Sequence, residues 1–337
     1  MLEKPRATDV HKAWRGALAS LLVLILSLSA VPAMAEGDSP LSAPQSALDG
    51  ALACPSSFDH PNHEPVLLVH GLGSTGEENW GWNYASTLPA LGYDVCTIDI
   101  PGRGWGDMQV SAEYVVHAVR RIAAVSGRQV DIMGHSQGGV EPRWVLRWWP
   151  RTRELVDDLV TLGTPHHGLA DPGAGDMGCP LPCAPPADWQ FRDSARFLRA
   201  LNSVDETPGR VSYTSIWSRN DELVQTLALG RPTSELDGAS NVAIQDLCAG
   251  RGVSHVGLAA DAVAFSLVMD ALAHAGPTDV TRFDRSTCSE LMMPGVSLPA
   301  SGDPVGWLTA PATAPRVAEE PPLASYATDG EPQRLPQ

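Results

Sequence analysis

Residues 130–139 read VDIMGHSQGG, and they join a mostly apolar run to the start of a helical pattern. The run Val130–Met133 has the character of a strand buried in a parallel sheet. Gly134–Gly138 then matches G-x-S-x-G in the strand–turn–helix context that this motif requires. A turn this tight needs glycine at its flanks, so Ser136 is expected to project its hydroxyl above the sheet, beside a helix N-terminus. The alternative is a chance match on a glycine-containing loop, and the flanking strand and helix argue against it.

Strand and helix patterns alternate on both sides of this stretch. Short apolar runs predict further strands at Val66–Val69, Asp94–Ile98, Leu159–Leu162, Val211–Trp217 and, more weakly, Val242–Leu247. Helical patterns lie between them: one capped by Ser111 and ended by Gly127, one over Gln137–Trp149, and one over Leu258–Ala275. This alternation predicts an α/β fold with a mostly parallel central sheet and helices on both faces. In such sheets, active sites form at the carboxyl ends of the strands.

A serine at such a turn needs a base, which follows it in the chain order Ser, Asp or Glu, His. His166 and His167 come too early for an acid to precede them, and His274 lies inside the last predicted helix. His255 lies between the last predicted strand and that helix, so we predict that His255 is the general base. A purely structural loop histidine is the alternative.

The acid should follow the strand that precedes the base. Asp221 lies in the loop after Val211–Trp217 and is favoured, with its neighbour Glu222 as the runner-up and Asp237 and Asp246 as weaker candidates. Its expected role is to accept a hydrogen bond from the imidazole and stabilise the imidazolium. Acidic residues in such loops are often only turn residues, so the choice of Asp221 depends on its place in the chain and not on its being acidic.

An oxyanion hole needs two backbone N–H donors. One is expected from Gln137, directly after the serine, and the other from Leu72 in the loop after Val66–Val69. The same loop, 71–76, also matches the G-x-G-x-x-G pattern of dinucleotide sites, with Asp99 after the next strand. Asp99 lies further away than the expected spacing of about 20 residues. We therefore expect no cofactor.

The N-terminus is expected to be an export signal. Four basic residues precede the apolar run Ala17–Val31, and a small-residue cleavage pattern ends at Ala35. We expect a signal peptide over 1–35 and a secreted, extracellular protein; the apolar run is short for the alternative, a membrane anchor. In oxidising surroundings the six cysteines are expected to form disulfides, and spacing alone does not choose their pairing.

The composition of the chain indicates which kinds of protein and which partners it fits. The 337 residues are 43% apolar and carry a formal net charge of −16, which fits a globular protein and disfavours nucleic acid as a partner. We expect an N-terminal segment (36–64), a catalytic domain (65–276) with a surface excursion or lid (168–190), and a proline-rich extension (277–337). The pairs His60/His63 and His166/His167 lack a ligand set of established spacing, so no metal site is expected.

With these residues assembled, the chain resembles secreted α/β-hydrolase lipases, especially the Candida antarctica lipase B type and the small Bacillus lipases. The resemblance runs from about Cys54 to Cys288. It includes Leu68–Gly71, the motif at Gly134–Gly138, and Thr161–Pro165 after the fourth strand. It also includes the passage from Tyr213 through the acid loop to Gln225, and His255–Leu258. The elbow has glycine and histidine before the serine, which is unlike the lipase B type and closer to ordinary bacterial lipases.

This resemblance implies ester hydrolysis, most simply of triacylglycerols, without a cofactor. It also implies the disulfides Cys54–Cys96 and Cys248–Cys288, and with them Cys179–Cys183. Leu72 stands where the lipase B type carries a hydroxyl, so no side-chain donor is expected there. The candidate walls of an apolar acyl pocket are Trp80, Trp105, Leu223 and Val224, with ordinary packing as the alternative.

The expected function is therefore a secreted serine ester hydrolase of the lipase or carboxylesterase kind. A cutinase-like polyester hydrolase is the near alternative, and a catalytically silent hydrolase fold used for binding is the alternative from another class. The expected partners are a lipid or small ester substrate and transient contact with a lipid interface. No protein partner is inferred.

Overall fold

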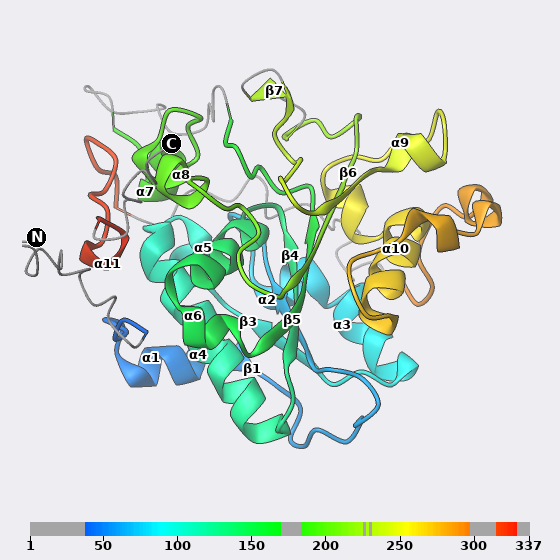
Figure 1. Ribbon diagram of the computed structural model, residues 1–337, viewed down its shortest axis with the longest axis horizontal. Helices are drawn as coiled ribbons and strands as arrows, with labels where there is room; N and C mark the ends of the chain where they lie inside the picture. The colour runs from blue at the N-terminus through cyan, green and yellow to red at the C-terminus, as the bar shows by residue number, and fades with distance from the viewer. Residues whose placement is uncertain (1–37, 170–182, 225–226, 229–230, 297–314, 329–337) are drawn as a thin grey trace, which may run out of the picture. The chain divides into compact units, whose positions relative to one another are not determined.

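The computed structural model describes residues 38–169, 183–224, 227–228, 231–296 and 315–328 (Figure 1). All of them fall within the unit Gly37–Gln337. The expected signal peptide and Cys179 lie outside the described residues. Within the described residues, no helix has the length and apolarity needed to cross a bilayer.

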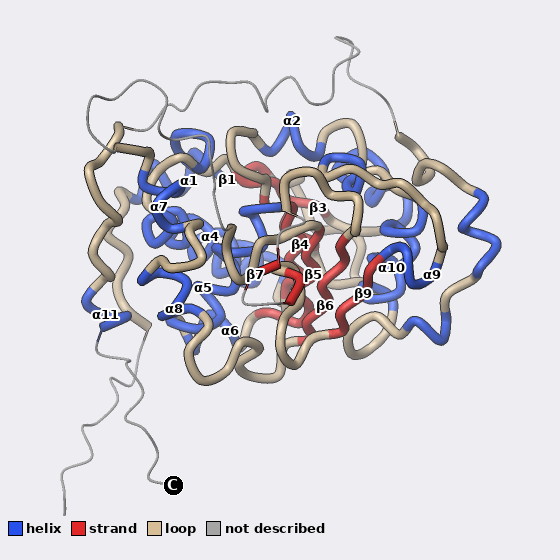
Figure 2. Tube along the Cα trace, turned by 90° about the horizontal axis from the view of Figure 1, so that it is seen from above, coloured by secondary structure: helices blue, strands red, loops and turns tan. Residues whose placement is uncertain are grey.

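A seven-stranded sheet forms the centre of this unit, with the strand order β1-β3-β2-β4-β5-β6-β9 (Figure 2). Only the short edge strand β1 runs antiparallel to its neighbour, and the other pairings are parallel. The strands are β1 (Leu52–Ala53), β2 (Val66–Val69), β3 (Val95–Ile98), β4 (Val130–His135), β5 (Val156–Leu162), β6 (Ser212–Trp217) and β9 (Ser240–Ala243). Two short strands, β7 (Leu227–Ala228) and β8 (Arg231–Pro232), form a separate hairpin. The predicted α/β class with a mostly parallel sheet is confirmed.

Helices cover both faces of the sheet (Figures 1 and 2). The α-helices are α1 (Gln45–Ala51), α2 (Gly76–Trp80), α3 (Tyr84–Thr87), α4 (Met108–Ser126), α5 (Val140–Trp148), α6 (Pro150–Arg153), α7 (Pro186–Gln190), α8 (Arg196–Leu201), α9 (Ile244–Leu247), α10 (Ala262–Ala273) and α11 (Ser325–Thr328). The 3₁₀ turns are η1 (Leu88–Leu91), η2 (Pro101–Gly104), η3 (Ser136–Gly139), η4 (Val256–Ala259), η5 (Val280–Arg282) and η6 (Arg285–Ser289).

Strand β2 shows how the two faces are filled. Leu67 and Val69 pack into the apolar core beneath α4 and α5, and Val66 and Leu68 pack into the second core beneath α10. All four side chains are fully buried. Because successive strand residues point to opposite faces, a strand covered on both sides needs a continuous apolar run rather than an alternating one.

Several predicted boundaries were wrong, each for a local reason. Asp107, not Ser111, caps α4: its carboxylate accepts a hydrogen bond from Gln109 N at 2.9 Å. The predicted strand Val242–Leu247 ends at Ala243, and its second half is the helix α9. The predicted helix Leu258–Ala275 is the turn η4 followed by α10, which Asp261 caps.

Two segments expected at the surface, the excursion 168–190 and the extension 277–337, contain described residues that pack on the helices covering the sheet. In the excursion 168–190, the residues 186–190 form α7, whose Ala187 and Gln190 are buried. In the extension 277–337, Val317 pairs with Ala184, and Tyr326 accepts a hydrogen bond from Trp144 Nε1 at 3.1 Å. The C-terminal residues 315–328 therefore lie against α5 and the chain next to α7.

Two disulfides have both cysteines among the described residues, Cys54–Cys96 and Cys248–Cys288. Both are the pairings that the resemblance implied. The first joins the segment after β1 to β3, and the second joins the end of α9 to η6. The third implied bridge includes Cys179, which lies outside the described residues.

We expect the Cys248→Ala/Cys288→Ala variant to be destabilised by up to about 4 kcal/mol, the chain-entropy value for a loop of this length. The bridge closes a sequence separation of 40 residues, so its loss frees a long loop in the unfolded chain. Urea unfolding, compared with wild type before and after reduction, measures the change. Equal stability of the oxidised and reduced wild type would contradict a structural role for the bridges.

Candidate active site

The turn after β4 brings the backbone of three segments into contact. A Cβ on Gly134 would lie 2.1 Å from Gly138 O, and a Cβ on Gly138 would lie 2.2 Å from Val69 O. Neither position has room for a side chain, which explains both glycines of the motif. Ser136, between them, has a φ of 55°, in the left-handed region that costs a non-glycine residue about 1–3 kcal/mol.

An imidazole and a carboxylate meet near this turn, from the loops after β9 and β6. His255 Nδ1 lies 2.7 Å from Asp221 Oδ2, and both residues are about 98% buried. The other carboxylate oxygen of Asp221 accepts hydrogen bonds from the N–H groups of Leu223 (2.9 Å) and Val224 (2.7 Å). Burial alone would raise the pKa of Asp221, but the hydrogen bonds from His255 and these amides lower it. Asp221 is therefore an ionised acceptor held in a fixed orientation.

The backbone of His255 is held separately from its ring. Glu222 Oε2 accepts a hydrogen bond from His255 N at 2.9 Å, and His135 Nε2 lies 3.1 Å from His255 O. Burial and the neighbouring His255 lower the pKa of His135 to about 3, so its ring is neutral near pH 7 and Nε2 carries the proton that it donates. Glu222, the runner-up acid of the sequence analysis, thus contacts the main chain of His255 while Asp221 contacts its ring.

The segment after β5 lies near both Ser136 and His255. Within the described chain, the Ser136 hydroxyl makes no hydrogen bond to His255. Thr164 Oγ1 donates to Ser136 O at 2.9 Å. A Cβ on the adjacent Gly163 would lie 3.0 Å from Asp221 Oδ2 and 3.2 Å from His255 Nδ1. Catalytic hydrogen bonds are often long before substrate binds. The sequence indicated the segment after β5 only through the resemblance, and nothing in its spacing indicated the bond from Thr164 to Ser136 or the closeness of Gly163 to Asp221 and His255.

The loop after β2 lies against Ser136, since a Cβ on Gly71 would be 3.1 Å from Ser136 Cβ. Buried His70 shapes this loop: Nδ1 donates to Gly71 O (2.8 Å), and Nε2 accepts from Ile100 N (2.9 Å). Burial lowers the pKa of His70, which keeps the neutral form that both bonds need. Asn79 Oδ1 accepts from Gly71 N at 2.9 Å, a contact that no spacing in the sequence indicates.

Residues of the chain itself hold the far side of this loop. Asp99, weighed above as the acid of a dinucleotide site, accepts a hydrogen bond from Gly76 N at 2.7 Å. Arg103 Nε donates to Gly73 O at 2.6 Å, Gly73 N donates to Arg103 O at 2.7 Å, and the guanidinium also pairs with Glu78. The backbone of the loop that carries Leu72 is therefore hydrogen bonded to other parts of the chain on both sides of Leu72, without any ligand.

The candidate pocket residues differ in exposure. Trp80 is fully buried and packs edge-on to His135, with ring centroids 6.2 Å apart, so in this structure its surface is covered by protein. Trp105 and Val224 are 9% and 6% exposed, and Leu223 is 45% exposed beside Asp221. Contact of these side chains with a substrate stays a prediction.

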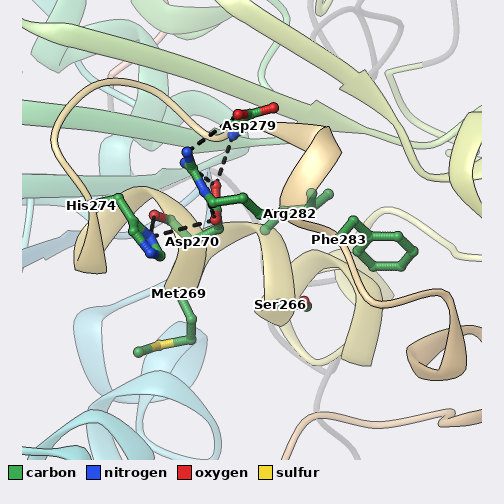
Figure 3. Close-up of a pocket in the computed structure, with 8 residues that line it drawn as sticks. Ser266, Met269, Asp270, His274, Asp279, Arg282 and Phe283 are labelled. Carbon is green, nitrogen blue, oxygen red and sulfur yellow. Dashed lines mark hydrogen bonds and ion pairs between the residues drawn. The ribbon is translucent and has the colours of Figure 1, made fainter.

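A pocket of about 230 Å³ lies elsewhere, along α10 and η5 (Figure 3). Its charged groups are paired with one another: Arg282 bonds both oxygens of Asp270, at 2.6 and 2.8 Å, and contacts Asp279 at 3.3 Å. Ser136, Asp221 and His255 do not line it. The histidine pairs weighed as metal ligands also have other partners, because His60 bonds Asp94 (2.9 Å) and His167 bonds Glu206 (2.9 Å).

Comparison with known proteins places this chain in a family. The family model described as Lipase (class 2) matches residues 63–251. Lipase B of Pseudozyma antarctica is 30% identical over 237 residues, which cover 69% of this chain and 68% of that protein. A triacylglycerol lipase of Pseudarthrobacter phenanthrenivorans is 33% identical over 110 residues, 31% of this chain and 34% of that protein.

Solved structures agree with the sequence comparison. The crystal structure of Aspergillus fumigatus lipase B has a TM-score of 0.76 and 30% identity, covering 87% of this chain and 74% of that one. The mature form of Bacillus licheniformis lipase BlEst2 has a TM-score of 0.50 at 21% identity, covering 62% and 92%, and shares the fold.

We expect Gly134→Ala to destabilise the protein by more than about 3 kcal/mol, because its new methyl would collide with backbone and not with a movable side chain. Gly252→Ala is the matched control: it lies in the His255 loop, and no atom comes within 4 Å of its Cβ position. Urea unfolding of both variants measures the difference. Equal stability of the two would show that the turn is not as tight as described.

Proposed function

The chain belongs to the class 2 lipase family, and we propose that it is a secreted serine hydrolase that cleaves carboxylic esters of lipids. One observation carries the assignment of residues: the buried 2.7 Å hydrogen bond between His255 and Asp221, at the same edge of the sheet as the strained Ser136. A neutral imidazole fixed by a carboxylate is the group that converts a serine hydroxyl into a nucleophile.

In the proposed reaction, Ser136 Oγ attacks the ester carbonyl while His255 Nε2 takes its proton. Asp221 holds Nδ1–H, which leaves Nε2 as the acceptor and stabilises the imidazolium. His255 then protonates the leaving alcohol, and an acyl group remains on Ser136. Water, deprotonated by His255, attacks the acyl-enzyme and releases the carboxylic acid.

The negative oxygen of each tetrahedral intermediate is proposed to bind the backbone N–H groups of Leu72 and Gln137. Gln137 is the second residue of η3, so its amide lies at a helical N-terminus. The fixed contacts of the Leu72 loop with His70, Asn79 and Arg103 support a donor that needs no reorganisation during the reaction.

The substrate class is proposed from the family and the surface beside the acid. The half-exposed Leu223 adjoins Asp221 and offers an apolar contact to an acyl chain or a lipid interface. Long-chain triacylglycerol is our first choice, with soluble short esters and polyesters of the cutinase kind as alternatives. A binding protein with a silent site is disfavoured because the Ser, Asp and His positions are all occupied.

Secretion is proposed from two features of the chain. Residues 1–35 carry the pattern of a signal peptide, and the disulfides Cys54–Cys96 and Cys248–Cys288 suit an oxidising compartment.

Substitutions at the site test the residue assignment. We expect Ser136→Ala to abolish ester hydrolysis while the protein stays folded, and Asp221→Asn to lower kcat by about 10⁴. Glu222→Gln is the matched control, because an amide oxygen can still accept from His255 N; we expect a loss within about tenfold, the range of one hydrogen bond. The readout is kcat on a chromogenic short-chain ester, with circular dichroism as the check of folding. Near-normal activity of Asp221→Asn together with a large loss in Glu222→Gln would move the acid to Glu222.

Substrate class is tested by hydrolysis rates across acyl lengths, with each ester offered in solution and as an emulsion. A lipase should act fastest on the emulsified long-chain triacylglycerol, because apolar contact area grows with each methylene. Preference for soluble short esters would indicate a carboxylesterase, and release of acid from a polyester film would indicate the cutinase-like alternative. Ser136→Ala supplies the background rate.

A further inference from the structure

The pairing of β4 with β5 is irregular near the amino ends of these strands, away from the end that carries Ser136. Between two regular pairs of the ladder, one residue of β4, Asp131, faces two residues of β5, Asp157 and Asp158. Two residues opposite one is the arrangement of a β-bulge, which re-aims side chains locally. Here it brings three acidic residues together between two inner strands of the sheet, near the amino ends of both.

The three carboxylates are close and shielded from water. One oxygen from each lies within 4.8 Å of the others. Asp131 and Asp158 are only 2% and 3% exposed, and Asp157 is half-buried. In the part of the chain that the structure describes, none of the three forms an ion pair; Arg128 instead pairs with Asp94 at 2.8 Å.

Two of the buried oxygens have no partner. The carboxyl group of Asp131 is hydrogen bonded by the backbone of Asp158, and that of Asp158 by the side chain of Ser212. The Oδ1 atoms of Asp131 and Asp158 are buried without a hydrogen-bond partner among the described residues. Leaving such an acceptor unsatisfied costs about 1–3 kcal/mol, and more when it is charged. Among the described residues, therefore, neither atom has a hydrogen-bond donor.

The negative charges of these carboxylates also repel one another. Burial and the neighbouring carboxylates raise the pKa of Asp131 well above its usual range, and burial and Asp157 raise the pKa of Asp158 to about 8. Glu64, just before β2, adds to this field, and its Oε2 is likewise buried without a partner. Buried like charges at this spacing are unfavourable unless a cation or a proton neutralises them.

We propose that Asp131, Asp157 and Asp158 bind a divalent cation, calcium, with Glu64 as a fourth carboxylate nearby. Oxygen-only donor sets select hard cations, and calcium accepts several carboxylates in flexible geometry. Calcium–oxygen distances are about 2.3–2.6 Å, so two ligands of one ion can lie up to about 5 Å apart, which the cluster satisfies. The ion would join β4, which leads to Ser136, to β5, which leads to Gly163 and Thr164. The site is independent of the proposed ester hydrolysis.

The test uses the full chain after removal of metals with EDTA. Calorimetric titration with CaCl₂ should show one bound ion, and Tm should rise by about 5 °C at a hundredfold excess over the dissociation constant. MgCl₂ should give a smaller rise, because magnesium gives up its water reluctantly. Asp131→Asn and Asp157→Asn should each lose the calcium-dependent rise. Asp49→Asn, an exposed carboxylate on α1 paired with His117, should keep it.

The alternative is that Asp131 and Asp158 share a proton. In that case calcium neither binds nor changes the Tm of wild type, and Asp131→Asn is more stable than wild type because it removes the repulsion. Either result overturns the proposal, as would a calcium-dependent rise that survives in both Asn variants. If Asp131→Asn does not fold, the titration of wild type and the half-buried Asp157→Asn variant still decide the outcome.

Discussion

The contact between backbones at the end of β4 is the constraint on which the rest of the site depends. Gly138 approaches the carbonyl oxygens of Val69 and His70 so closely that no side chain fits, and the chain must turn sharply there. The turn forces Ser136 to a φ of 55°. Its cost, about 1–3 kcal/mol, is offset by the buried strands on either side. The turn places Ser136 at the edge of the sheet to which the loops after β2 and β5 also come close.

Those loops are held by polar groups whose protonation states are fixed by burial. His70 and His135 are fully buried and neutral, and each uses one ring nitrogen to bond a backbone oxygen. Asp221 is buried as well, yet its acceptor role keeps it ionised. Similar residues thus make different contacts: His70 and His135 bond the backbone of the loops, and the carboxylate of Asp221 bonds the ring of His255. Glu222 accepts a separate hydrogen bond from the main-chain N–H of His255.

The parts of this arrangement that follow from local sequence were predictable. The glycines of 134–138 and the chain order of Ser136, Asp221 and His255 indicated the fold class and the candidate site. Contacts between distant segments were not predictable, because nothing in the spacing relates Asn79 to Gly71, or Gly163 to His255. Helix starts were misplaced where two capping residues competed, as with Asp107 and Ser111. The cluster at Asp131 could not be predicted because it depends on a register shift between β4 and β5, which the spacing of the acidic residues in the sequence does not indicate.

The neutrality of His135 has a consequence for how acidity would act on the protein. The His135 ring directly precedes Ser136 in the chain and stands 4.7 Å from the His255 ring, so a positive charge on His135 would act directly on the candidate site. The pKa of His135, lowered to about 3 by burial and the neighbouring His255, places its ionisation below the range between weakly acidic and alkaline solution. Through that interval the His135 ring therefore stays uncharged, and it adds no ionisation of its own to a pH–rate profile.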